Sequence, residues 1–186
     1  MNQKISTKRI AMAGLLAALT VVGSGLRITI PVSLGGNTAF HLGNIMCALS
    51  GILLGPWLGG AAAGIGSAIY DMTNPAYIDE AWLTFLMKGA YALVTGAVIS
   101  VGKKEFGYVK AILATLGGAV TYAILYLAKS FLKTMIVSGT TAEAALVAMT
   151  LKFPATIFNA AVALIFAPIL AVAIRKALKQ NHISLN

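Results

Sequence analysis

The sequence predicts an all-α integral membrane protein whose chain crosses the bilayer six times. Hydrophobic residues make up 59% of its 186 residues, charged residues only 10%, and the mean hydropathy is +0.87. A soluble domain carries roughly 25% charged residues, so this chain cannot solvate an ordinary surface. Because a transmembrane helix needs ~20 apolar residues, the length allows about six helices. We therefore expect residues 1–186 to form a single six-helix membrane domain.

Six apolar runs, separated by helix-breaking residues, give the expected helices. The first run ends at Pro31, which begins a polar, glycine-containing loop over residues 31–40. Gly55-Pro56 makes a tight turn between the second and third runs, and a polar loop over residues 71–80 follows the third. We expect the helices at about residues 10–30, 41–54, 57–70, 81–101, 111–137 and 142–177.

The second half of the chain contains the longest runs. A basic loop over residues 102–110 leads from the fourth helix to the fifth, and residues 138–141 turn the chain into the sixth. Pro154 and Pro168 lie inside this last run, where we expect them to kink the helix rather than end it.

The charges between the runs orient the chain. The loops on one side, with the residues directly next to them, carry Asp71, Asp79, Glu80 and Glu143 and no lysine or arginine. Basic loops stay in the cytoplasm, so we expect both termini to be cytoplasmic and the net charge of +9 to be a topology signal rather than a nucleic-acid footprint. The basic residues expected on the cytoplasmic side are Lys4, Lys8, Arg9, Lys103, Lys104, Lys110, Arg175, Lys176 and Lys179.

Several kinds of chemistry have no support in the sequence. The segment over residues 96–104 is the nearest approach to a phosphate-binding P-loop, but its glycine spacing is wrong. Cys47 is the single cysteine, and His41 and His182 are the only histidines. No nucleophile, acid and base cluster, so we expect no enzyme activity, no metal site and no cofactor.

Lysines inside the predicted helices are the strongest functional signal. Ionisable groups within a bilayer are costly and by default mark a function. A rise of 1.5 Å per residue places Lys88 and Lys152 at similar depths, roughly a third of the way in from the outer side. Lys129 is nearer the surface and fits a pocket or a snorkelling role equally well, whereas Lys133 and Arg27 are interpreted as interfacial.

Polar and aromatic residues of the same outer layer predict a pocket for a flat, polar ligand. Aromatic rings can stack a heterocycle while amides and hydroxyls bind its edges, although each aromatic residue taken alone is as typical of an interfacial belt. The loops over residues 31–40 and 71–80 would form the roof. The expected binding residues are Asn37, His41, Asn44, Asp71, Asn74, Tyr77, Trp82, Lys88, Tyr91, Tyr126, Lys129, Lys152 and Asn159.

Small residues recur at helical spacing. Gly51, Gly55 and Gly59 lie four residues apart, a pattern that lets helices approach closely in lipid. Ala13 and Ala17 have the same spacing in the first helix. We interpret the glycines as internal packing, and the alanines as either packing or a docking face for another membrane protein.

Short motifs in the first half of the chain resemble the substrate-binding S components of energy-coupling factor (ECF) transporters. The resemblance is densest over residues 37–96. The motifs are His41-Leu42-Gly43-Asn44, Gly51-Ile52-Leu53-Leu54-Gly55-Pro56, Gly64-Ile65-Gly66-Ser67-Ala68-Ile69-Tyr70-Asp71 and Thr84-Phe85-Leu86-Met87-Lys88-Gly89.

This resemblance implies a vitamin-capturing subunit in a prokaryotic plasma membrane. Such subunits bind a vitamin at the outer face under a lid formed by the first loop, and they associate with a transmembrane coupling subunit and two ATPases. The docking motif of the family maps onto Ala13 and Ala17, and ATP hydrolysis would belong to the partners.

Within the family, the sequence looks most like the riboflavin, hydroxymethylpyrimidine and pyridoxine group. Members often carry His-x-Gly-Asp where this chain has Asn44, and the missing carboxylate favours a neutral or anionic ligand over a cationic one. A self-sufficient secondary transporter or channel for a small polar solute is the alternative, although the inverted repeat typical of such proteins is not evident in the sequence.

Overall fold

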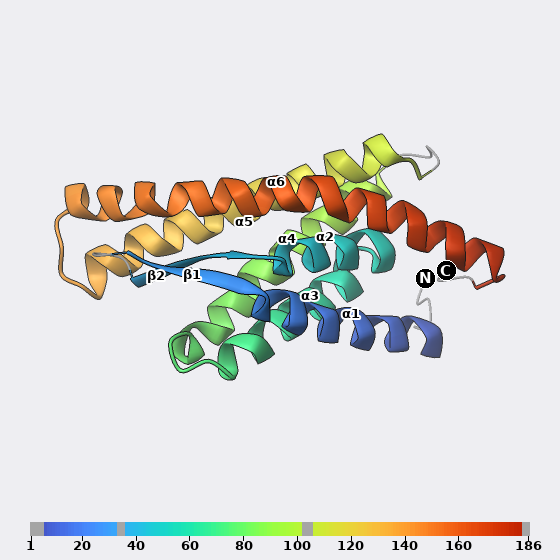
Figure 1. The fold of residues 1–186 in the computed structure, drawn as a ribbon, viewed down its shortest axis with the longest axis horizontal. Helices are drawn as coiled ribbons and strands as arrows, with labels where there is room; N and C mark the ends of the chain where they lie inside the picture. The colour runs from blue at the N-terminus through green and yellow to red at the C-terminus, as the bar shows by residue number, and fades with distance from the viewer. Residues whose placement is uncertain (1–5, 33–35, 102–105, 184–186) are drawn as a thin grey trace.

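The computed structural model describes residues 6–32, 36–101 and 106–183. Within these ranges the chain forms six α-helices, a short 3-10 helix and a two-stranded sheet. The helices lie side by side along the long axis of the molecule, and the start of α1 and the end of α6 lie at the same end (Figure 1). The elements are α1 Thr7–Gly25, β1 Arg27–Val32, β2 Gly36–His41, α2 Gly43–Leu54, α3 Pro56–Met72, η1 Ile78–Glu80, α4 Ala81–Ser100, α5 Tyr108–Ile136 and α6 Ala142–Gln180.

Four helical segments are long and apolar enough to cross a membrane. They are Thr7–Gly25, Ile78–Ser100, Tyr108–Ile136 and Ala142–Gln180. The two other helices, α2 and α3, have 12 and 17 residues, fewer than the ~20 that a full crossing usually takes. The predicted helices are therefore present, whereas six membrane crossings stay a prediction.

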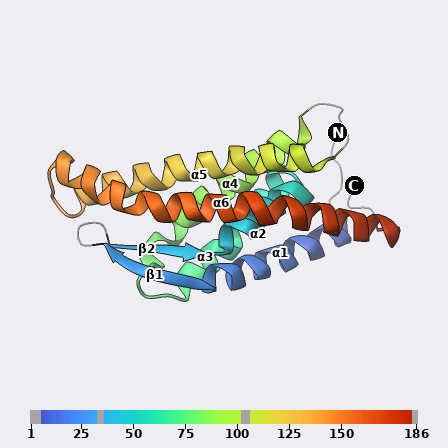
Figure 2. The same cartoon turned by 45° about the horizontal axis from the view of Figure 1, so that its top comes forward.

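The structure corrects the sequence prediction between residues 27 and 41. The first helix ends at Gly25 and not at residue 30, and β1 and β2 pair antiparallel, with Arg27 opposite His41 and Pro31 opposite Asn37 (Figure 2). The run Ile28-Thr29-Ile30 is β-branched, which favours an extended chain, but its hydropathy alone continues that of the helix before it. Residues 33–35 of the predicted roof lie outside the described residues, as do Lys4, Lys103 and Lys104.

Glycines bring the first four helices close together. A Cβ atom at Gly51 would overlap the carbonyl oxygen of Ala92 on α4, and one at Gly66 would overlap that of Ala17 on α1. Gly51 and Gly66 tolerate only a hydrogen as side chain, and a Cβ at Gly59 would overlap the Ser50 carbonyl of α2, so these glycines serve packing within the chain. Gly55 does not, because its Cβ position is open and its φ of +81° instead makes the turn. The close contact between α2 and α4 also brings Asn44 within reach of Lys88.

The longest helix, α6, spans 39 residues and continues through both Pro154 and Pro168. It packs against α5 and α2 and contacts both strands of the hairpin. The hairpin extends from the end of α1 along the same side of the molecule, away from the end that holds the start of α1 (Figure 2). The hairpin faces the C-terminal parts of α3 and α5 and the N-terminal parts of α4 and α6 across the pocket described below.

Candidate functional site

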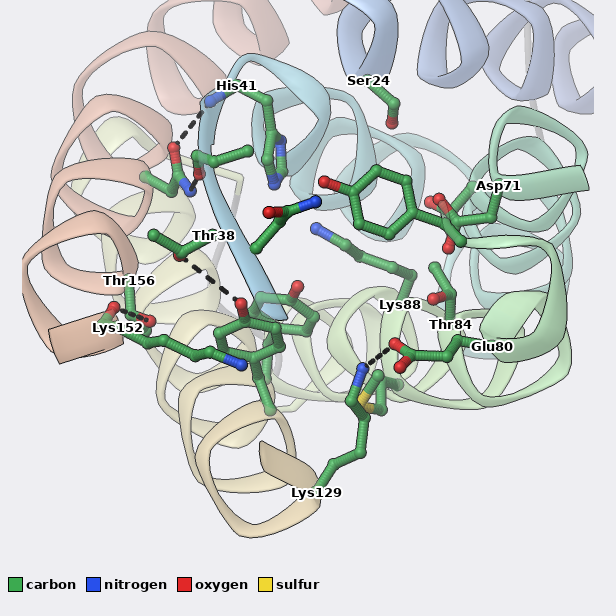
Figure 3. Close-up of a pocket in the computed structure, with 18 of the residues that line it drawn as sticks. Ser24, Thr38, His41, Asp71, Glu80, Thr84, Lys88, Lys129, Lys152 and Thr156 are labelled. Carbon is green, nitrogen blue, oxygen red and sulfur yellow. Dashed lines mark hydrogen bonds and ion pairs between the residues drawn. The ribbon is translucent and has the colours of Figure 1, made fainter. Parts of the chain in front are cut away.

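A polar pocket occupies the space beneath the β-hairpin (Figure 3). It encloses about 160 Å³, and every main element except α2 contributes to its wall. The lining residues are Ser24, Arg27, Asn37, Thr38, Ala39, His41, Ser67, Asp71, Ala76, Tyr77, Glu80, Thr84, Met87, Lys88, Tyr122, Tyr126, Lys129, Lys133, Lys152, Thr156 and Asn159. The pocket thus gathers residues that are up to 135 positions apart, between Ser24 and Asn159.

Most of the residues predicted from the sequence line this pocket. They are Asn37, His41, Asp71, Tyr77, Lys88, Tyr126, Lys129, Lys152 and Asn159. Asn44 lies beneath the wall as a partner of Lys88, and the buried ring of Tyr91 makes an edge contact with Tyr122. Two others point elsewhere: Asn74 accepts a hydrogen bond from the Ala76 amide at 3.0 Å, and Trp82 is 63% exposed.

Lys88 holds the deepest charge in the pocket. Its side chain is buried on α4, its ammonium donates to Oδ1 of Asn44, and it lies 4.0 Å from the centre of the Tyr122 ring. A buried ammonium is costly unless it is paired or hydrogen-bonded. An amide oxygen and an aromatic face offset that cost without cancelling the charge, and an ammonium has three donors. Lys88 can therefore present a positive charge to a ligand.

At the mouth of the pocket, Glu80 joins η1 to α5. Its two carboxylate oxygens pair with Lys129 and Lys133, whose side chains are one turn apart on α5. Lys133, expected at the interface, thus lines the pocket, and Glu80 is a pocket residue outside the predicted set. The signal was present, because an acidic residue in an outer loop faces lysines near the outer end of a predicted helix.

Two tyrosines of α5 form an aromatic wall. The rings of Tyr122 and Tyr126 are stacked, with centroids 5.7 Å apart and planes at 18°. The Tyr126 hydroxyl lies 3.5 Å from that of Thr38 on β2, and the Lys129 ammonium is 5.7 Å from the Tyr126 ring. Residues four apart share a helix face, so Tyr122, which was not among the predicted binding residues, could have been included on the strength of Tyr126.

Arg27 lies at the start of β1 and faces the pocket instead of the membrane surface. Its guanidinium sits 4.1 Å from the Tyr70 ring centre and 4.9 Å from that of Tyr77, and its Nε donates to the Ser24 carbonyl at 2.7 Å. These contacts fix the start of the hairpin. The sequence predicts an interfacial role because it places Arg27 near the end of the first helix, whereas the residue lies in β1.

Asn159 on α6 holds the second strand of the hairpin. Its Oδ1 accepts the amide of His41 at 2.9 Å, and its Nδ2 donates to the carbonyl of Ala39 at 2.8 Å. Beside it, Phe158 makes an edge contact with Phe40 at 4.9 Å between ring centres. The amide of Asn159 pairs with β2 as a neighbouring strand would, so this residue positions the roof of the pocket.

The imidazole of His41 is held in its neutral form. Its Nδ1 accepts the amide of Gly43 at 3.2 Å, which places the remaining proton on Nε2. Burial lowers the pKa of His41 well below its usual value, and the charges of Lys88 and Arg27 lower it further. At neutral pH the residue therefore adds no charge to the pocket.

The pocket has an excess of positive charge. Five cationic side chains line it, against the two carboxylates of Asp71 and Glu80. A cleft lined by one sign of charge attracts ligands of the opposite sign. Among the described residues, no three His, Cys, Asp or Glu side chains are grouped so that they could hold a metal ion.

The two alanines predicted to dock a partner are only partly exposed. Ala13 and Ala17 are half-buried and pack against a core cluster to which all six helices contribute. Gly14 and Ala18, one position further along, are exposed, and a Cβ at Gly14 would meet no atom within 4 Å. Gly14 and Ala18 are thus more exposed on α1 than Ala13 and Ala17.

Comparison with known proteins gives two similarities. The sequence model of the family described as "ECF-type riboflavin transporter, S component" matches residues 4–176. A protein of Pyrococcus woesei, described as an uncharacterized protein in the gap 3' region, is 32% identical over 114 residues, which cover 61% of this chain and 72% of that protein.

Proposed function

The chain belongs to the family of ECF-type riboflavin transporter S components, and from this we propose that its polar pocket captures a small, water-soluble vitamin or vitamin precursor. The chain is a multi-pass membrane protein, and its family is one of transport proteins and not of enzymes. The observation that carries the proposal is the pocket itself, where a stacked tyrosine wall faces buried and half-buried cations under a hairpin roof.

The size of the pocket favours a ligand with a single ring. A cavity of ~150 Å³ is large enough for one benzene molecule, and the pocket encloses about 160 Å³. A pyridoxine-like or hydroxymethylpyrimidine-like heterocycle suits this space better than the three fused rings of riboflavin. Its ring would lie along Tyr122 and Tyr126, and its polar edges would reach Lys88 and the hydroxyl groups of Thr38 and Thr156.

The charge of the pocket favours a neutral or anionic ligand. Lys88 has an amide partner in Asn44 where a carboxylate would have neutralised it. A cationic ligand would have to approach five cationic side chains, of which Lys129 and Lys133 are paired with Glu80.

For the arrangement in the membrane, we propose six crossings, with α2 and α3 as short ones, both termini in the cytoplasm and the pocket facing outward. The basic ends of α1 and α6 carry Lys8, Arg9 and Arg175, whereas Asp79 and Glu80 lie at the pocket end. This distribution agrees with the positive-inside rule.

Uptake would require partners that supply energy. We propose that a transmembrane coupling subunit and two ATPase subunits act with this chain, and that the coupling subunit packs on α1. Because Ala13 and Ala17 are half-buried, the exposed Gly14 and Ala18 beside them are better placed for close helix contact in lipid.

Mass spectrometry of small molecules released from the purified protein tests the proposal most directly. A stoichiometric single-ring heterocycle, followed by calorimetric binding of the same compound, is the expected result. A protein that is empty and binds none of pyridoxine, hydroxymethylpyrimidine, riboflavin or pantothenate would refute it. Uptake into liposomes by this chain alone would instead support the secondary transporter or channel.

A further inference from the structure

A second cavity lies at the opposite end of the molecule from the pocket. It is an open groove of about 640 Å³ between the first turn of α1, the turn that joins α2 to α3, the end of α4 and the last third of α6. None of its lining residues belongs to the vitamin pocket. The lining residues are Arg9, Ile52, Leu53, Leu54, Gly55, Pro56, Trp57, Leu58, Ala61, Ile99, Ser100 and Arg175.

Two arginines make one end of this groove positive. Arg9 donates from Nη2 to the Leu54 carbonyl at 2.6 Å, and Arg175 donates from Nη2 to the Ile52 carbonyl at 2.7 Å. A guanidinium has five N–H donors, so these two bonds leave most donors available. Nε of Arg9 is buried without a hydrogen-bond partner among the described residues.

The start of α3 adds to the positive end. The helix begins at Pro56 within the groove, and the first N–H groups of a helix point outward along its axis with a partial positive charge. Among the described residues that line the groove, none is acidic. Both arginines donate to carbonyl groups in the last turn of α2, whose partial negative charge offsets theirs only in part.

The remaining walls are apolar and reach the surface. Leu53, Leu58 and Ile99 form them, and Trp57, at the rim, is 80% exposed. A water-soluble anion would leave these walls bare. A molecule with an anionic head and an apolar tail matches both parts of the groove.

We propose that this groove binds an anionic phospholipid of the cytoplasmic leaflet, with its phosphate at Arg9 and Arg175 and an acyl chain along Leu58 and Ile99. With the termini in the cytoplasm, the groove opens at the inner membrane interface, where anionic lipids concentrate and tryptophan is enriched. The inference rests on the proposed orientation of the chain and not on the identity of the vitamin.

The two tryptophans of the chain allow a direct test, because Trp57 lies at the groove and Trp82 at the other end of the molecule. The full-length protein would carry either Trp82→Phe, which leaves Trp57 as the reporter, or Trp57→Phe, which leaves Trp82. Each is placed in phosphatidylcholine bilayers with a small fraction of lipid brominated near the headgroup. We expect brominated phosphatidylglycerol to quench Trp57 more than brominated phosphatidylcholine does, and Trp82 to show no such preference.

Charge variants then locate the site. Each of Arg9→Gln and Arg175→Gln should lower the preference of Trp57 for phosphatidylglycerol about fivefold, the equivalent of ~1 kcal/mol per basic residue at an anionic surface. Lys179→Gln, an exposed charge at the same end of α6 outside the groove lining, is the matched control and should leave the preference unchanged.

A further variant keeps the test valid if the arginine variants fail to fold. Ala61→Phe fills the groove without removing a charge and should also abolish the preference. Equal quenching by the two lipids, an equal effect of Lys179→Gln, or an unchanged preference in Ala61→Phe would each overturn the proposal. So would displacement of the lipid by millimolar inorganic phosphate, or arginine variants that weaken only assembly with the coupling subunit. Vitamin binding is measured separately, so either proposal can fail alone.

Discussion

The contact between Asn159 and β2 makes a prediction that does not depend on the identity of the ligand. Asn159→Ala removes two hydrogen bonds between α6 and the hairpin, the 2.9 Å bond from the His41 amide and the 2.8 Å bond to the Ala39 carbonyl. The pairing of β1 with β2 and the contact of Phe40 with Phe158 would remain. The hairpin should therefore keep its shape and open more readily.

The size of this effect follows from the two bonds. Each net hydrogen bond contributes ~1 kcal/mol, so the closed position loses ~2 kcal/mol, and the open form becomes about 30-fold more populated at a factor of ten per ~1.4 kcal/mol. Hydrogen exchange of the residue 36–41 amides, read by mass spectrometry, should quicken by about the same factor. Dissociation of a bound ligand should quicken in parallel if the hairpin must open to release it.

A matched control lies on the same chain. Asn181→Ala also removes an asparagine amide bond, from Nδ2 to the Ala177 carbonyl at 2.8 Å, but at the exposed far end of α6. It should leave exchange in β2 unchanged. If Asn159→Ala exchanged no faster than the wild-type protein at residues 36–41 while remaining folded, the role of Asn159 as the anchor of the roof would be refuted.

Three further predictions concern charge in and near the pocket. Lys88→Met should weaken binding of an anionic ligand about 10- to 100-fold by calorimetry, since a hydrogen bond to a charged group contributes ~1.5–3 kcal/mol. Lys133 is half-exposed, so Lys133→Met should weaken binding of the same ligand less than about fivefold. Glu80→Gln frees two lysines and should raise affinity for an anion by up to about fivefold at low salt, a gain that high salt removes. Folding lowers the pKa of His41, so the neutral form stabilises the fold above pH ~6.5. The unfolding temperature in detergent should fall as pH drops below that value, less so in His41→Gln; an identical pH profile for this variant would contradict the assignment.

Most of the helices could be predicted from the sequence because all but the first end near a change in composition. The breakers at Gly55-Pro56 and at residues 138–141 fall where the structure turns. The hairpin could not be found in this way, because Ile28-Thr29-Ile30 is as apolar as the helix that precedes it. Only the β-branched character of the run distinguishes a strand from a continued helix there, and hydropathy does not measure it.

The depth of a charged residue within its helix predicts the residues of the inner pocket better than the residues at its mouth. A charge at the depth of Lys88 and Lys152 predicts a functional role, and both residues line the pocket. Trp82 was chosen for its residue type and its place beside a polar loop, and its side chain is exposed. The direction of a side chain near a helix end depends on the entry of the chain into the helix, here through η1, which the sequence pattern does not contain.

The lysines of the pocket also run against the rule that orients the rest of the chain. Positive charges are retained on the cytoplasmic side. In the orientation that we propose, Lys88, Lys129, Lys133 and Lys152 lie toward the outer side and oppose the topology that Arg9 and its neighbours favour. Glu80 neutralises part of this charge, and Asn44 and Tyr122 solvate another part without neutralising it. Packing alone would be served at lower cost by apolar residues of similar volume. The cationic excess is therefore best explained by a ligand that brings the missing negative charge with it.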